Sequence, residues 1–196
     1  GVLAACNNIN DLNNNLFLIV LLIFGSIIMR SAGCIINDIF DRNYDKKVNR
    51  TTLRPLAKGT ISVSNALICF AFLSLLGLSI LLSLDKLSII IGLIAFILLL
   101  IYPLMKRITY WPQLVLGITF NIGVLISFAA VTATINLSII FLYLAGIFWT
   151  LGYDTIYAHQ DKEDDLRIGV KSTAILFGVN SKKIISLFYF LMFLCL

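Results

Sequence analysis

The chain has 196 residues, of which 60% are hydrophobic and only 13% charged, and its formal net charge is +5. This composition excludes an ordinary soluble domain, in which about a quarter of the residues are charged. It also gives no reason to expect a nucleic-acid partner, because the basic residues gather in the linkers between long apolar segments.

These apolar segments have lengths suited to crossing a bilayer, whose hydrocarbon core of about 30 Å needs about 20 helical residues. Residues 1–5 are expected to be the end of an earlier helix. The predicted spans are then, in chain order, about 16–38, 63–84, 88–105, 113–132 and 137–157, with a partial span at 184–196. We therefore expect an all-α, multi-pass transmembrane helix bundle. It forms a single membrane-embedded domain over residues 1–196, truncated at both ends.

The linkers between these spans differ in charge. Thirteen of the fifteen basic residues lie in the linkers at about 42–62, 106–112 and 158–183, whereas the alternate linkers carry only Lys86. Positively charged linkers mark the cytoplasmic side, or the matrix side in mitochondria. The expected location is a bacterial or mitochondrial inner membrane.

The first full span ends in a row of polar side chains. Asn37, Asp41 and Asp45 are spaced by four residues, so they share one face of a helix. Carboxylates at this spacing repel each other unless a cation lies between them. Oxygen ligands without Cys or His suit Mg²⁺.

A second acidic group follows the span at 137–157. Asp154, Asp161 and Asp165 are spaced by seven and four residues and are predicted to form a matching stripe. Either stripe alone is equally compatible with the solvated rim of a bundle. Two stripes on one side of the membrane, where rims usually favour Lys and Arg, favour a pair of Mg²⁺ sites around a diphosphate.

Basic residues stand near both stripes. Arg50 and Arg54 follow the first one, and Lys106 and Arg107 end another span. Each can bind a phosphate or a carboxylate, but each can also be a simple determinant of topology. Arg30 lies within a span, where a cation is costly and marks a candidate functional site. Snorkelling to the interface is the alternative.

Three motifs together resemble the UbiA superfamily of intramembrane prenyltransferases, and the resemblance covers nearly the whole chain. The motifs are Met29-Arg30-Ser31-Ala32-Gly33-Cys34 leading into Asn37-Asp38-x-x-Asp41-x-x-x-Asp45 and Arg50-Thr51-x-x-Arg54-Pro55, then Tyr102-Pro103-Leu104-Met105-Lys106-Arg107 with Pro112-Gln113, and last Tyr153-Asp154-x-x-Tyr157-Ala158-x-x-Asp161-x-x-x-Asp165 with Lys171-Ser172-Thr173.

The resemblance implies roles for particular residues. Those expected to hold Mg²⁺ with the diphosphate are Asn37, Asp41, Asp45, Asp161 and Asp165. Those expected to bind the diphosphate or the acceptor are Arg50, Arg54, Lys106 and Arg107. Those expected to orient ligands or substrate are Asp38, Asp154, Tyr102 and Tyr157. Among all of these, the residues expected to be catalytic are Asp41, Asp161, Asp165, Lys106 and Arg107.

Within the superfamily, the stretches at 29–34 and 102–113 most resemble the enzymes that prenylate 4-hydroxybenzoate. The implied reaction is Mg²⁺-dependent transfer of a polyprenyl group from polyprenyl diphosphate to the ring of 4-hydroxybenzoate, in ubiquinone biosynthesis. The bilayer is a further partner. The alternatives are another acceptor, namely haem, a naphthoate or a chlorophyll precursor. A cation transporter is more remote, because transporters place their acids near the midplane of the bilayer.

Overall fold

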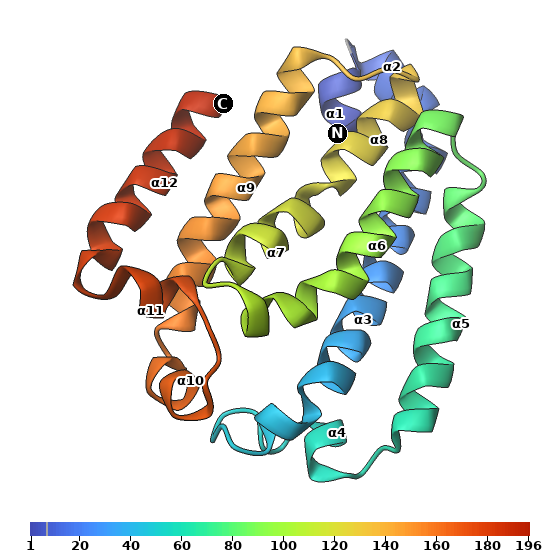
Figure 1. Ribbon diagram of the computed structural model, residues 1–196. Helices are drawn as coiled ribbons and strands as arrows, with labels where there is room; N and C mark the ends of the chain where they lie inside the picture. Colours follow the sequence, from blue (N-terminus) through green and yellow to red (C-terminus); the bar gives the residue numbers. More distant parts are fainter. Residues whose placement is uncertain (7) are drawn as a thin grey trace.

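The computed structural model describes residues 1–6 and 8–196, and in these residues all of the regular structure is helical (Figure 1). The helices are α1 (Val2–Ala5), α2 (Ile9–Asn14), α3 (Leu16–Asp45), α4 (Pro55–Lys58), α5 (Val63–Leu81), α6 (Lys86–Ile108), α7 (Pro112–Asn121), α8 (Gly123–Thr132), α9 (Leu137–Ala158), α10 (Lys162–Ile168), α11 (Thr173–Phe177) and α12 (Ser181–Cys195), with a 3₁₀ turn η1 at Gly178–Asn180.

Six segments among the described residues are long and apolar enough to cross a membrane. They match the six predicted spans in number and order, which confirms the expected multi-pass, all-α fold class. The limits differ most in three places. Helix α3 continues past residue 38 to Asp45, the span at 113–132 is divided between α7 and α8, and the last span begins at Thr173 rather than at 184.

Close contacts between neighbouring spans depend on small residues. Helix α9 lies between α7 and α12, and α3 packs along α5 (Figure 1). A Cβ atom on Gly117 of α7 would lie 3.2 Å from the carbonyl oxygen of Ile147 on α9. Small residues let helix backbones approach this closely, and the resulting van der Waals contact drives association in lipid.

The polar ends of several helices meet at one end of the bundle. The end of α3, the short α4 and the α10 segment lie together at the bottom of the view, whereas α1 and α2 lie at the opposite end (Figure 1). Both acidic groups therefore lie at the same end of the molecule, as the alternation of charged linkers predicts.

The second acidic group is not a continuous helical stripe, so that prediction is wrong. Helix α9 ends at Ala158, and Asp161 is the N-cap residue of the separate helix α10. Residues 159–165 are all polar, so no apolar residue continues the packed face of α9 through this segment. The chain turns here, and it brings Asp161 and Asp165 back over the end of the bundle.

Candidate active site

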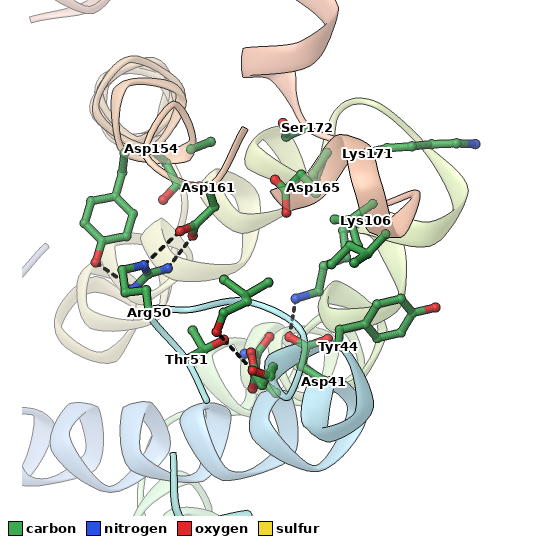
Figure 2. A pocket seen from close by; sticks show the side chains of 18 of the residues that line it. Asp41, Tyr44, Arg50, Thr51, Lys106, Asp154, Asp161, Asp165, Lys171 and Ser172 are labelled. Atoms are coloured by element: carbon green, nitrogen blue, oxygen red, sulfur yellow. Dashed lines mark hydrogen bonds and ion pairs between the residues drawn. The ribbon is translucent and has the colours of Figure 1, made fainter. Parts of the chain in front are cut away.

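A cavity of about 240 Å³ opens among the polar helix ends (Figure 2). It lies between the end of α3, the loop after it, the ends of α6 and α9, and the α10–α11 segment. Eleven of the thirteen residues predicted for the site line it: Asn37, Asp41, Asp45, Arg50, Arg54, Tyr102, Lys106, Asp154, Tyr157, Asp161 and Asp165. Asp38 and Arg107 are adjacent to the cavity but do not line it.

Asp41 is the most deeply buried of the acids, with 1% of its surface exposed. The Lys106 ammonium at the end of α6 donates a hydrogen bond to its Oδ2 atom. The Arg107 guanidinium lies 3.8 Å from Oδ1 and donates to the carbonyl oxygen of Phe40 at 2.7 Å. Arg107 also covers the ring of Tyr44 at 4.9 Å. Arg107 therefore connects the end of α6 to the end of α3 beside the cavity.

Arg54 joins the other two acids at the end of α3. Its guanidinium donates to Asp38 at 2.9 Å and to Asp45 at 3.1 Å. The hydroxyl of Thr51 donates to the carbonyl oxygen of Asp45 at 3.1 Å, which folds the loop back against the helix. Asp38 and Asp45 therefore share a single cation from the loop that follows α3.

Arg50 reaches across the cavity to the second acidic group. It donates to both carboxylate oxygens of Asp161, at 3.0 and 2.5 Å, and to the Tyr157 hydroxyl at 3.2 Å (Figure 2). The hydrogen bond with Asp161 raises the pKa of the Arg50 guanidinium. This bidentate pair connects the loop after α3 with the start of α10, 111 residues later.

The carboxylate of Asp165 makes no hydrogen bond or ion pair with any described residue, although it is partly buried. Burial, and then the neighbouring charge of Asp161, raise the pKa of Asp165 to about 6. A carboxylate kept without a cation in a cavity wall is costly, and such perturbed groups cluster at functional sites.

Two buried oxygen atoms also lack a donor. Asn37 Oδ1 and Asp41 Oδ1 are buried without a hydrogen-bond partner in the described part of the chain. They lie one helical turn apart on α3, and both residues line the cavity. A buried acceptor without a donor costs about 1–3 kcal/mol. The described side chains contain no group of three or more His, Cys, Asp or Glu residues that could hold a metal by themselves.

Three more residues of the cavity wall, Gln113, Lys171 and Ser172, had no role predicted from the sequence. The backbone N–H of Lys171 donates to the Lys106 carbonyl at 2.8 Å. The Lys171 ammonium donates to the Ile108 carbonyl at 3.0 Å. Ser172 and Gln113 complete this wall. All three residues belong to the motifs quoted above, but only their contacts across the fold reveal what they do.

The chain is similar to proteins of one known family. The model of the UbiA prenyltransferase family matches residues 1–196. The mitochondrial 4-hydroxybenzoate polyprenyltransferase of Drosophila melanogaster is 54% identical over 159 residues, which are 81% of this chain and 41% of that protein. The chain thus spans about two fifths of the length of this relative.

Two solved structures share the fold. The apo structure of a UbiA homolog from Aeropyrum pernix K1 is 25% identical, with a TM-score of 0.77 over 89% of this chain and 68% of that one. A UbiA homolog from Archaeoglobus fulgidus, bound to GPP and Mg²⁺, is 20% identical, with a TM-score of 0.76 over 90% of this chain and 63% of that one. The match of the family model to the whole chain confirms the resemblance seen in the motifs: the chain belongs to the UbiA prenyltransferase family.

Proposed function

We propose that the chain is the catalytic part of a Mg²⁺-dependent 4-hydroxybenzoate polyprenyltransferase of the mitochondrial inner membrane, with its site on the matrix side. The proposal rests on the cavity, in which acidic and basic side chains lie together on two facing walls. A site for a metal ion alone needs no Lys or Arg side chains, and a site for an anion alone needs no carboxylates. A diphosphate with its Mg²⁺ ions needs both.

The side chains present fit Mg²⁺. The donors are Asn37, Asp41 and Asp45 on one wall, and Asp161 and Asp165 on the other. Mg²⁺ usually binds through one or two carboxylates together with substrate phosphates, so an incomplete set of ligands in the protein alone is expected. The Oδ1 atoms of Asn37 and Asp41 accept no hydrogen bond and the Asp165 carboxylate forms no ion pair within the described residues, so these oxygens are available to bind it. When bound, Mg²⁺ neutralises negative charge on the departing diphosphate.

The ion pairs in the cavity would then exchange partners. Lys106 now neutralises Asp41, and Arg50 now neutralises Asp161. If a divalent cation balanced the charge of these carboxylates, Lys106 and Arg50 could donate hydrogen bonds to phosphate oxygens instead. The planar guanidinium of an arginine matches the geometry of phosphate oxygens well. Arg54 keeps Asp38 and Asp45 in place. Asp154 and Tyr157 complete the wall formed by α9.

The acceptor requires a second anion-binding group, because 4-hydroxybenzoate carries a carboxylate. Arg30 lies seven residues before Asn37 on α3, which places it about 10 Å further into the membrane. Its guanidinium covers the ring of Phe120 at 4.9 Å, and Phe120 packs against the cavity residue Tyr102 at 6.2 Å. Arg30 forms no ion pair with any described carboxylate. It is therefore better placed for the acceptor than Lys106 or Arg107, which both lie beside Asp41.

The proposed function is tested with membranes that contain the full chain, 4-hydroxybenzoate and a radiolabelled polyprenyl diphosphate. We expect labelled prenylated 4-hydroxybenzoate in the presence of Mg²⁺ and none after chelation. A product only with a naphthoate, haem or a chlorophyll precursor would keep the prenyltransferase activity but change the acceptor. Transport of Mg²⁺ into sealed vesicles without any prenylated product would contradict the proposal.

Replacing Arg30 by Gln should raise the KM for 4-hydroxybenzoate by about tenfold or more, because one charge-assisted contact with its carboxylate is lost. The KM for the polyprenyl diphosphate should stay unchanged. Arg42→Gln is the matched control, since Arg42 is an exposed arginine of the same helix that lies about 18 Å from Arg30 along the helix axis. Equal KM values for both variants would show that Arg30 does not bind the acceptor.

A further inference from the structure

Gln113 is a buried polar residue of the cavity wall that the proposed function does not yet use. It is the second residue of α7, and only 6% of its surface is exposed. Its side-chain oxygen Oε1 accepts a hydrogen bond from the backbone N–H of Thr173 at 3.1 Å. The little surface that it keeps lines the cavity.

The contact with Thr173 determines which way the side-chain amide faces. A backbone N–H can only donate, so its partner must be the amide oxygen and not the NH₂ group. The NH₂ group therefore takes the other position. It donates to no group in the described residues. Only the oxygen of the Gln113 amide thus has a hydrogen-bond partner, and the two N–H donors of its NH₂ group are available to a ligand.

A second buried hydrogen bond holds this amide in place. The hydroxyls of Thr173 and Thr155 lie 2.7 Å apart, and both residues are 0% exposed. Gln113 on α7, Thr173 on α11 and Thr155 on α9 thus form a chain of contacts across three helices. A donor on such a rigid support loses little conformational entropy when it binds a ligand.

We infer that the Gln113 amide donates a hydrogen bond to a phosphate oxygen of the bound diphosphate, and so positions the leaving group opposite the two acidic walls. This inference rests on the proposed function. The cavity around Gln113 favours a phosphate oxygen, because its wall includes Lys106 and the start of α7. The N-terminus of a helix carries a partial positive charge that attracts anions.

The test uses inorganic pyrophosphate with Mg²⁺ as an inhibitor of prenyl transfer in membranes containing the full chain. Gln113→Glu keeps an oxygen to accept from Thr173 but replaces the NH₂ donor with a negative oxygen. Its inhibition constant for pyrophosphate and its KM for the polyprenyl diphosphate should both rise by about tenfold or more. The KM for the acceptor should stay close to that of the wild type, whereas the thermal unfolding midpoint should fall, because the variant buries an additional carboxylate.

Two further variants separate this positioning role from a general effect of added charge and from a loss of stability. Gln160→Glu adds the same negative charge at an exposed position that does not line the cavity, and it should leave pyrophosphate inhibition unchanged. Thr150→Val removes the hydrogen bond that Asn121 donates to the buried Thr150 hydroxyl away from the cavity, and it should lower the unfolding midpoint without changing the inhibition constant. If Gln113→Glu does not accumulate, Gln113→Met takes its place, since it loses the amide without adding a charge.

The outcomes distinguish a failure of the proposed function from a failure of the role given to Gln113. If pyrophosphate does not inhibit the wild type, the proposed function fails. If it inhibits the wild type and both Gln113 variants equally, the proposed function stands and Gln113 is only a link between α7 and α11. Weaker inhibition that is shared by Gln160→Glu or Thr150→Val would also overturn the inference.

Discussion

Asp165→Asn is expected to abolish prenyl transfer, whereas Asp164→Asn, one residue earlier, leaves it near the wild-type rate. Asp165 lines the cavity and has no cation partner among the described residues, while Asp164 lies outside the cavity and forms an ion pair with Arg167 at 3.7 Å. Removing a ligand of the metal loses several kcal/mol of charge stabilisation in the transition state. The rate should fall by about a thousandfold, because each 1.36 kcal/mol is tenfold.

The same pair of variants separates a role in the site from a role in folding. Because the pKa of Asp165 in the folded protein is raised to about 6, its charge is disfavoured there at pH 7 relative to the unfolded chain. Replacing this carboxylate by a neutral amide should therefore keep or raise the thermal unfolding midpoint. Loss of activity together with undiminished stability identifies a functional group. Equal turnover in both variants, or a fall in the midpoint of Asp165→Asn, would contradict its assignment as a ligand.

Lys106→Met should destabilise the protein strongly in the absence of Mg²⁺. It leaves the buried carboxylate of Asp41 without its main partner, since Arg107 remains 3.8 Å away. Breaking a buried ion pair costs about 3–5 kcal/mol, and we expect the low end because Lys106 keeps 27% of its side-chain surface exposed. The measurement is the unfolding midpoint in detergent with a chelator present.

Adding Mg²⁺ with pyrophosphate should then restore much of the lost stability, because a cation bound at Asp41 replaces the missing ammonium. Lys183→Met is the control, since Lys183 is an exposed residue of α12 and its loss should change nothing in either condition. A deficit in Lys106→Met that is the same with and without Mg²⁺ would show that Asp41 faces no metal. The assignment of the first wall would then be withdrawn.

Local sequence patterns were sufficient to predict the fold class, the order of the spans and the grouping of the acids at one end. These follow from local properties, because hydropathy selects about 20 residues at a time and linker charge selects the side. The i, i+4 spacing of Asn37, Asp41 and Asp45 was also sufficient to place them on one wall, since α3 continues as a helix through all three.

Which charged side chains pair with each other depends on how the helices pack. Lys106 pairs with Asp41 over 65 residues of sequence, and Arg50 pairs with Asp161 over 111. Spacing could not reveal that Arg107 turns to the backbone of α3, that α9 stops before Asp161, or that Gln113 presents its amide to the cavity. Each of these depends on how packed helices bring together residues far apart in the chain. The local spacing of residues does not determine that packing.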